Sequence, residues 1–321
     1  MSSLETALRT VIANPLSSDA HESLGDAWRE AGRPIAAAAC YRTADSLGDP
    51  TVLRLFKLAL AEIQAGRTAP ARARLSALPD GLPEAVADQV TKALELCETI
   101  PETPLEAGDH NRHLRMATLA AFLRGQGLPE TMDLLDVGGG DGLLCHHLPA
   151  ARYRLAEPGT NGLRGESLQF PEQSVDVVVA CHVLEHVPAD ARFIFLDSLR
   201  HISRGHLVLL NPFAVPAGRY EERLQVILEL TGAEWAKEHM ECGLPELSVV
   251  KKYADTRGLK LHVEPQGSTA SSFLSTMVTH YAQLAGRETE LTRIHRYLNS
   301  LDPALLTNTA LPTSYLVHFS W

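Results

Sequence analysis

Apolar positions along the chain follow two periods, which predict helices in the first third and buried strands further on. Up to about residue 100, apolar residues recur at the 3.6-residue spacing of amphipathic helices. From residue 134 the pattern changes to short runs rich in apolar residues, at 134–137, 152–156, 175–180 and 206–210. Nearly continuous apolar runs are typical of strands buried on both faces. Strands that alternate with helices predict an α/β region behind an all-α one.

The helical region repeats itself after 34 residues. In the first copy Gly25 and Tyr41 are the small and the large residue expected between two antiparallel helices, and Ala59 and Leu75 replace them in the second. The full set of matching positions in the first copy is Leu24, Gly25, Trp28, Gly32, Ala37, Tyr41, Ala44 and Pro50. This spacing resembles the tetratricopeptide repeat. We expect further helices at residues 3–13 and about 84–98 to cover the open ends.

The repeats have two interpretations, which the sequence leaves open. They can form a groove for a protein partner or for self-association, or a helical cap that stabilises the neighbouring domain. Prolines in PDGLPEAV and IPETPLEAGDH interrupt the helical pattern. We therefore predict a helical domain over residues 1–104 and a second domain over 105–321, with an insertion at about 213–247.

A glycine-rich segment, MDLLDVGGGDGLLCHHL at residues 132–148, carries the strongest signal. An apolar strand leads into Gly138–Gly142, and a helix is expected to begin close to Leu143. Strand, glycine turn and helix let a ligand approach the backbone at the carboxyl edge of a sheet. A dinucleotide-binding loop or a simple tight turn would share this pattern. A second strand ends in Glu157, 19 residues after the first glycine, where an acid commonly binds ribose hydroxyls.

Four successive motifs carry a family resemblance. D-V-G-G-G-D-G, A-E-P, F-P-E-Q-S-V-D-V-V and V-L-E-H-V-P resemble the signatures of class I S-adenosylmethionine-dependent methyltransferases of the type 11/12 kind. The resemblance implies a Rossmann-like, doubly wound sheet of seven strands in the order 3-2-1-4-5-7-6. Its last strand would be SYLVHFSW. In this chain only twelve residues separate Glu157 from Phe170, so the crossover that normally holds a third strand is shortened.

The resemblance also implies S-adenosylmethionine as the cofactor. Glu157 would bind its ribose, the glycine loop would lie under its methionine part, and Ser167 and Leu168 would flank the adenine. The complete set of cofactor residues implied is Asp136, Gly138, Gly139, Gly140, Asp141, Gly142, Glu157, Ser167, Leu168 and His182.

The motif His182-x-x-Glu185-His186 follows the strand at 175–180, where reactive groups are common in this superfamily. On a helix the three side chains would share one face. Transfer to an oxygen needs a group that removes its proton, so we predict His182 or His186 as the general base. Some methyltransferases of the superfamily hold a divalent metal ion with Glu-x-x-Glu-His, and here His182 replaces the first Glu. We favour a site without metal, with His182, Glu185 and His186 as the alternative ligand set.

Two helices flank this region and are expected to contribute little chemistry. The helix before the glycine loop is expected to present a solvated basic face, with the mouth of the cofactor site as the alternative place for its residues: His110, Arg112, His113 and Arg115. A later helix is expected to bury an apolar stripe: Ile294, Tyr297, Leu298 and Leu301.

The insertion supplies the expected acceptor-binding residues Tyr220, Trp235 and His239, since insertions at this edge commonly build pockets. The stretches EHMECGLPE and TSYLV are similar to methyltransferases encoded among bacterial surface-glycan genes. The acceptor implied is a sugar hydroxyl on a glycan, or a small hydroxylated metabolite. The alternatives are an N-methyltransferase whose repeats bind a target protein, and a scaffold that has lost activity.

Composition narrows the partners and the compartment. The net charge is −10, whereas a domain that grips nucleic acid usually has a basic surplus, so we expect no nucleic-acid partner. The five cysteines form no C-x-x-C pair, which argues against a disulfide framework or structural zinc. The N-terminus lacks the pattern of a signal peptide, and the chain has no run of about 18 apolar residues. We expect a cytoplasmic protein without a membrane span.

Overall fold

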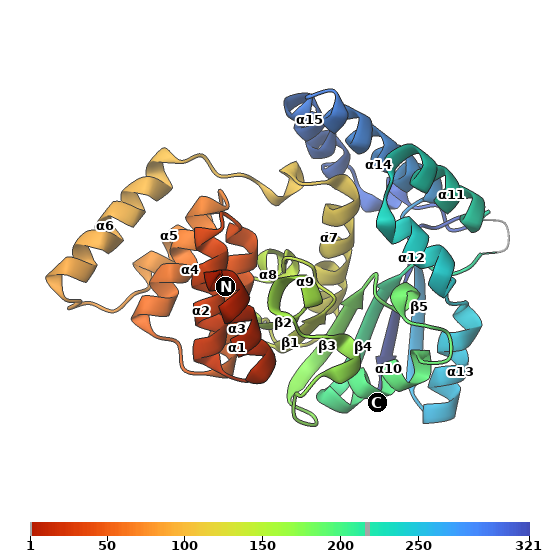
Figure 1. Ribbon diagram of the computed structural model, residues 1–321, viewed down its shortest axis with the longest axis horizontal. Coiled ribbons are helices and arrows are strands. Elements are labelled where there is room, and N and C mark those ends of the chain that lie inside the picture. The colour runs from red at the N-terminus through yellow and green to blue at the C-terminus, as the bar shows by residue number, and fades with distance from the viewer. Residues whose placement is uncertain (1, 216–218) are drawn as a thin grey trace. The chain divides into compact units, whose positions relative to one another are not determined.

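The computed structural model describes residues 2–215 and 219–321, which divide into two compact units (Figure 1). Unit 1 comprises residues 1–105 and 128–171, and unit 2 comprises residues 106–127 and 172–321. The helical repeats thus share a compact unit with the glycine-rich segment. The division into domains at residue 104 remains a prediction. Three residues of the predicted insertion, 216–218, lie outside the described part of the chain.

Unit 1 begins with six helices that follow the predicted 34-residue spacing. They are α1 (Ser3–Ala13), α2 (Ser18–Glu30), α3 (Pro34–Leu47), α4 (Val52–Gln64), α5 (Thr68–Ser76) and α6 (Glu84–Thr99). The starts of α2 and α4 are 34 residues apart, and so are those of α3 and α5. The helices expected at 3–13 and 84–98 are confirmed as α1 and α6.

The contact between Gly25 and Tyr41 explains the first repeat. A Cβ at Gly25 would lie 2.6 Å from a ring carbon of the fully buried Tyr41, so only glycine lets α2 and α3 approach this closely. In the second copy Leu75 and Ala59 belong to one core cluster, where the smaller leucine leaves room for an alanine methyl. The two repeats therefore differ at both positions together, Gly25 with Tyr41 and Ala59 with Leu75, and the helices pack closely in each.

Two parallel strands complete the core of unit 1: β1 (Asp133–Val137) and β2 (Arg152–Ala156). A helix covers β2 where the family would place a third strand. The backbone N–H of Leu155 donates to the Thr43 hydroxyl of α3 (3.1 Å), and the Arg152 and Arg154 guanidinium groups donate to the Ser46 carbonyl. Helix α3 therefore satisfies one backbone donor of β2 that a neighbouring strand could otherwise bind, and anchors two of the strand's arginine side chains.

The prediction of seven strands is wrong, because the described residues contain six. Between β2 and β3 the chain forms only the short helix α9 (Pro158–Asn161) and the 3-10 turn η2 (Gly165–Ser167). Twelve residues are too few for a crossover helix and another strand, since a βαβ crossover alone takes at least about 10–12 residues. The predicted order, which includes that strand, is not confirmed.

Unit 2 holds the other four strands, in the order β3-β4-β6-β5: β3 (Val175–Cys181), β4 (Ser203–Asn211), β5 (Lys260–Gln266) and β6 (Ser314–Ser320). β3 and β4 run parallel, and β6 runs antiparallel to both β4 and β5. The expected C-terminal strand is thus present. Figure 1 shows α10 (Arg192–Ile202) and α13 (Leu247–Arg257) beside these strands.

The remaining helices of unit 2 are α7 (His110–Gly125), α11 (Tyr220–Thr231), α12 (Glu234–Cys242), α14 (Thr269–Leu284) and α15 (Glu288–Asn299). Of these, α11, α12, α14 and α15 lie toward one end of the strands, whereas α7 runs along them, with Phe122 against His262 and His318 (Figure 1). Two of these helices, α11 and α12, belong to the predicted insertion. Among the described residues, none of the helices has the length and apolar character needed to cross a bilayer.

Two expectations about helix faces are wrong. His110 and His113 of α7 are 3% and 9% exposed rather than solvated, because α7 packs against α14 and α15. On α15, Ile294 and Tyr297 are exposed, whereas Leu291 and His295 are buried. His295 accepts a hydrogen bond from the backbone N–H of His110 (3.2 Å). A polar residue therefore lies on the buried face of α15, and a search for apolar positions alone does not identify that face.

Candidate active site

The glycine loop of unit 1 leaves β1 through residues with positive φ. Gly138, Gly140 and Gly142 have φ of 72°, 62° and 85°, which side chains rarely tolerate. A Cβ at Gly139 would lie 2.2 Å from the Asp136 carboxylate, and one at Gly142 would lie 2.3 Å from the Cβ of Ala39. The expected helix after the loop is the four-residue α8 (Leu144–His147). The glycine loop therefore packs so closely against Asp136 of β1 and Ala39 of α3 that Gly139 and Gly142 have no room for a side chain.

Glu157 lies directly after β2, as expected, and both its oxygens face backbone of neighbouring loops. Oε2 accepts from the N–H of Gly140 (3.0 Å) and Oε1 from the N–H of Gly159 (2.9 Å). The side chain is only partly buried. Because a carboxylate has about four acceptor sites, Glu157 retains capacity for two hydroxyl donors. These features fit a ribose.

Asp136 supports the loop from within. It is 1% exposed and accepts a hydrogen bond from the Tyr153 hydroxyl (2.7 Å). Burial and the Asp136 charge raise the pKa of Tyr153 well above its usual value, so the phenol keeps its proton and remains a donor. Of the other residues predicted to bind the cofactor, Asp141 is partly buried on the loop. Ser167 ends η2 and Leu168 follows it.

The helical repeat contacts the same loop through hydrogen bonds that the sequence did not reveal. The indole N–H of Trp28 donates to the Thr160 carbonyl (2.8 Å), and the Thr160 hydroxyl donates to the Gly140 carbonyl (2.6 Å). On the other side of the loop, Arg42 donates to the carbonyls of Cys145, Leu148 and Ala151. Both helices of the first repeat thus hold the candidate cofactor cradle.

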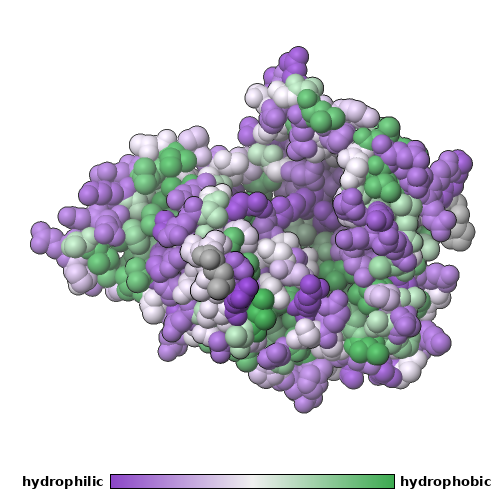
Figure 2. Space-filling model, viewed as in Figure 1, coloured by the Kyte–Doolittle hydropathy of each residue, from purple (hydrophilic) through white to green (hydrophobic). Residues whose placement is uncertain are grey.

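Unit 2 contains a cavity of about 510 Å³. Its wall is rich in hydroxyl and amide side chains: Asn111, Gln266, Ser268, Ser271, Ser272, Thr276, Thr279 and Gln283. Seven residues named from sequence also line it: His110, Arg115, His182, His186, Tyr220, Trp235 and His239. In Figure 2 hydrophilic side chains gather around the hollow beside α7 and α14. Its volume lies within the range of about 300–1,000 Å³ found for small-molecule sites.

His182 follows β3 with a φ of 57°, a conformation that side chains adopt rarely and mostly where function requires it. Its Nε2 lies 3.1 Å from the Ser314 hydroxyl, and its Nδ1 lies 3.2 Å from Glu185 Oε1. Burial and the charge of Arg115 lower the pKa of His182. The motif does not form the helix on which its three side chains would share one face, since Leu184–His186 form a 3-10 turn (η3) and His182 precedes it.

Glu185 is fully buried, and three histidines surround it. Asn211, the last residue of β4, donates to Oε2, whereas Oε1 accepts no hydrogen bond from the described residues. Oε1 lies 3.8 Å from His239 Nε2 as well as 3.2 Å from His182 Nδ1. Burial opposes ionisation of Glu185, but the adjacent His182 lowers its pKa below the usual value.

His239 comes from α12 of the insertion and completes this cluster. Its Nε2 lies 3.1 Å from His186 Nε2, and its Nδ1 lies 2.8 Å from the Tyr220 hydroxyl. The Trp235 ring meets the imidazole edge-on at 5.3 Å. Burial lowers the pKa of His239 to about 4, so the ring is neutral near pH 7. The insertion thus brings its three predicted acceptor residues together.

Sequence reasoning missed two residues of the cluster. They are Asn211, the last residue of β4, and Glu238 of α12, whose carboxylate lies 3.0 Å from His186 Nδ1. The His-x-x-Glu-His motif predicted that the site lies directly after β3. The spacing of 26 residues between Glu185 and Asn211 carries no pattern that would pair them.

The comparison with protein families identifies the domain. Residues 109–240 match a family model described as a methyltransferase domain. The chain therefore carries a methyltransferase domain of the class that its motifs resemble, the class I S-adenosylmethionine-dependent methyltransferases. The cofactor of this class, S-adenosylmethionine, is the one expected from the motifs.

Solved structures share a distant likeness with the chain. The YcgJ protein of Bacillus subtilis is 14% identical over 64% of this chain and 97% of its own, with a TM-score of 0.38. A methyltransferase of Archaeoglobus fulgidus is 15% identical over 65% and 94%, with a TM-score of 0.41. Phosphoethanolamine N-methyltransferase 2 of Haemonchus contortus is 12% identical over 62% and 51%, with a TM-score of 0.38. A search of curated proteins finds no match.

Proposed function

We propose that this protein is an O-methyltransferase that acts on a hydroxylated small molecule, with a sugar hydroxyl, free or on a glycan, as the preferred acceptor. The observation that carries the proposal is the cavity of unit 2. Hydroxyl and amide side chains of α14 and α7 line it, and such groups donate to and accept from the hydroxyls of a polyol. Some of these groups already bond within the protein, as Asn111 does to Thr276 and Thr279 to Asp109, but hydroxyl and amide groups retain further donor and acceptor capacity.

In this proposal unit 1 binds the cofactor. The carboxylate of Glu157 would accept hydrogen bonds from the ribose hydroxyls. The glycines of the loop have no side chains that would keep the cofactor away from the backbone of the loop. S-adenosylmethionine supplies a methyl group on a sulfonium, which passes to the acceptor oxygen as the carbon–sulfur bond breaks and the electrons remain on sulfur.

The acceptor oxygen must also lose its proton, and His182 and His186 are the candidate bases. Burial and the charge of Arg115 lower the pKa of His182, so a neutral imidazole that can accept a proton is available near pH 7. The partly buried His182 and the Ser314 hydroxyl both line the cavity.

Two measurements test this function. Calorimetric titration with S-adenosylmethionine should give binding to the wild type that Glu157→Ala weakens by at least about tenfold, since charged hydrogen bonds contribute roughly 1.5–3 kcal/mol. Glu166→Ala is the matched control, because this exposed carboxylate lies nearby in η2. Cofactor with a labelled methyl group is then offered to sugars, oligosaccharides, small phenols and a protein extract.

The expected product is a methyl ether on a sugar or another hydroxylated small molecule. His182→Gln should reduce turnover by about 10²–10⁴-fold, as the loss of a general base does, and by far more than any change in cofactor affinity. Label found on lysine or arginine of a protein would replace the proposal by N-methylation. A folded protein that binds no cofactor would point to a scaffold.

A further inference from the structure

The side chains around Glu185 have the arrangement of a metal site. Three ligand atoms from Glu185, His186 and His239 lie within 4.8 Å of one another. Glu185 and His239 are buried, and His186 is partly exposed. Two of the three residues come from η3 and the third from α12, so they meet only when the insertion folds onto the motif after β3.

The distances are close to those between ligands of one ion. Nitrogen and carboxylate ligands lie about 2.0–2.2 Å from a divalent transition metal, so two neighbouring ligands are about 2.8–3.1 Å apart in an octahedral site and about 3.3–3.6 Å apart in a tetrahedral one. The Nε2 atoms of His186 and His239 are 3.1 Å apart, and His239 Nε2 is 3.8 Å from Glu185 Oε1. All three ligand atoms lie within 4.8 Å of one another, so modest movements of the side chains would bring them around one ion.

The outer nitrogens of both histidines are held in the way that metal ligands usually are. His186 Nδ1 faces the Glu238 carboxylate (3.0 Å), and His239 Nδ1 faces the Tyr220 hydroxyl (2.8 Å). When these nitrogens carry the protons, both Nε2 atoms are left with a lone pair and point toward each other. Such outer partners orient metal-binding imidazoles in proteins.

The buried carboxylate supplies an independent observation. Glu185 is 0% exposed, and its Oε1 lies 3.2 Å from His182 Nδ1 and 3.8 Å from His239 Nε2, with neither contact forming a hydrogen bond of good geometry. Among these residues no Lys or Arg forms an ion pair with Glu185. A buried carboxylate is costly unless it is paired with a cation or binds a metal. A divalent ion between Oε1 and the imidazoles would provide this charge.

We propose that Glu185, His186 and His239 bind a divalent first-row transition metal ion, such as Zn²⁺ or Mn²⁺, at the wall of the unit 2 cavity. This assignment replaces the metal-free site favoured from sequence and differs from its alternative set by exchanging His182 for His239. Two imidazoles and one carboxylate suit these ions better than Mg²⁺ or Ca²⁺, which prefer oxygen ligands. Three protein ligands leave positions open for other molecules.

The open positions fit the acceptor, a step that rests on the proposed function. His186 and His239 line the cavity, so an ion bound to them would be accessible to a hydroxyl there. A metal-bound hydroxyl loses its proton more readily because the cation stabilises the oxyanion. His182, which is not a ligand in this assignment, remains the base that takes the proton.

Metal binding is tested on the intact chain without cofactor or acceptor. Protein stripped with a chelator is titrated with Zn²⁺, Mn²⁺ and Mg²⁺ by calorimetry, and Co²⁺ binding is followed by visible absorption. One Zn²⁺ or Mn²⁺ per chain should bind more tightly than Mg²⁺. Glu185→Gln and His239→Gln should each weaken binding by at least about 100-fold, and Tyr220→Phe by about 10–100-fold, as loss of an outer partner does.

His201→Gln is the matched control, because its exposed imidazole lies 3.8 Å from a glutamate but outside the cluster. Circular dichroism confirms that each variant is folded. Weak binding that all variants share would show adsorption to surface histidines and overturn the proposal. So would a folded wild type that binds no ion, which would leave a protonated imidazole as the partner of Glu185.

Failure of the metal proposal is separate from failure of the proposed function. Full methyl transfer by chelated, metal-free enzyme would reject the metal and keep the function. Specific metal binding in a protein that methylates no hydroxylated acceptor would do the reverse.

Discussion

His146 shows how strongly the surroundings of a single residue shape unit 1. It is buried in α8 beside the glycine loop, and its Nε2 has no hydrogen-bond partner among the described residues. Burial, followed by the charges of Arg42, Arg67 and Arg74, lowers its pKa to about 3. All three arginines come from the helical repeat. The folded protein therefore keeps this imidazole neutral far below the pH at which an exposed histidine is protonated.

We predict that His146 makes the protein less stable in mild acid. The pKa is about 6.5 in the unfolded chain and about 3 in the folded one, so between these values the unfolded state binds the extra proton. Stability is complete above pH 6.5 and falls below it by at most about 1.4 kcal/mol per pH unit. Between pH 7 and pH 5 His146→Leu should lose roughly 2 kcal/mol less than the wild type in urea unfolding.

His201→Gln serves as the control for this measurement, since that side chain is mostly exposed and should leave the pH dependence unchanged. Equal pH dependence in His146→Leu and the wild type would show that the imidazole is protonated in the folded protein.

The residues of the candidate site were predictable to different degrees. The glycines of the loop and Glu157 could be predicted as cofactor-binding residues from sequence. The sharp turn after a parallel strand requires glycine, and an acid commonly follows the second strand. Tyr220, Trp235 and His239 could be named only as candidates within an insertion. The pairing of Glu185 with His239 and Asn211 depends on how α12 and β4 meet, and no periodicity in the sequence records such a contact.

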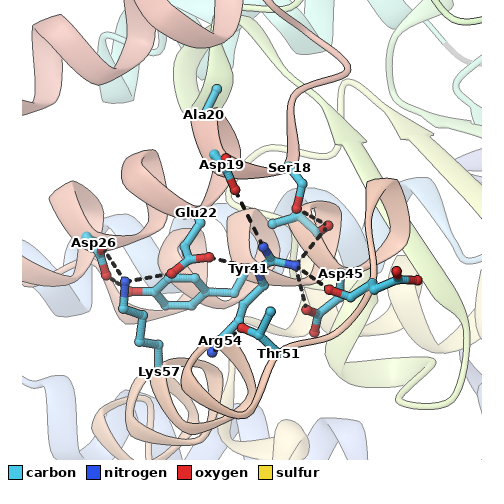
Figure 3. A network of polar contacts seen from close by, with 12 residues as sticks. Ser18, Asp19, Ala20, Glu22, Asp26, Tyr41, Asp45, Thr51, Arg54 and Lys57 are labelled. Carbon is cyan, nitrogen blue, oxygen red and sulfur yellow. Dashed lines mark hydrogen bonds and ion pairs between the residues drawn. The ribbon is translucent and has the colours of Figure 1, made fainter.

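At the level of elements, helices α2, α3 and α4 are joined by a network of charges (Figure 3). Arg54 of α4, which is 4% exposed, donates to Glu22 (2.9 Å) and Asp45 (3.4 Å) on the two preceding helices. Lys57 contacts Glu22 and Asp26, both at 2.7 Å, and Tyr41 donates to Asp26. The network fixes the helices that carry Trp28 and Arg42.

Trp28 is predicted to position the cofactor cradle. Trp28→Phe keeps an aromatic ring but removes the donor to the Thr160 carbonyl, and Thr160 in turn holds the Gly140 carbonyl. Loss of one hydrogen bond of about 0.5–1.5 kcal/mol should raise the dissociation constant of S-adenosylmethionine by about two- to tenfold. Isothermal calorimetry measures this change.

Tyr41→Phe is the matched control, because it removes one hydrogen bond from the same repeat without touching the loop. It should lower stability and leave cofactor affinity as it was. If both variants weaken the cofactor equally, the effect comes from general loosening of the helices.

The positions of helices and strands along the chain were easier to predict than the elements against which each of them packs. The 34-residue period placed α2 to α5 correctly because helix packing demands small and large residues at fixed intervals. The missing third strand was signalled by the twelve-residue crossover. The sequence did not indicate that α3 replaces that strand. The replacement depends on hydrogen bonds of Thr43 and Ser46, which look like ordinary polar positions of a helix.

For the whole molecule, we predict that the methyltransferase part does not function without the helices. A fragment of residues 105–321 would expose the edge of β2 that α3 covers, and uncovered strand edges promote aggregation. It should be insoluble, or soluble without measurable cofactor affinity. Adding residues 1–104 as a separate chain should restore solubility, as judged by size-exclusion chromatography and calorimetry.

A monomeric fragment that binds the cofactor as tightly as the full chain would contradict this prediction. It would favour the other interpretation of the repeats, a detachable groove for a protein partner.

The chain also contains its own optical reporters. It has three tryptophans, of which Trp28 contacts the candidate cofactor loop and Trp235 lines the candidate acceptor cavity. The third, Trp321, ends the chain after β6. Indole emission responds to changes in hydrogen bonding and solvent contact, so single-tryptophan variants would let cofactor and acceptor occupancy be followed separately in a stopped-flow fluorimeter. The order in which the two ligands arrive could then be observed without any added label.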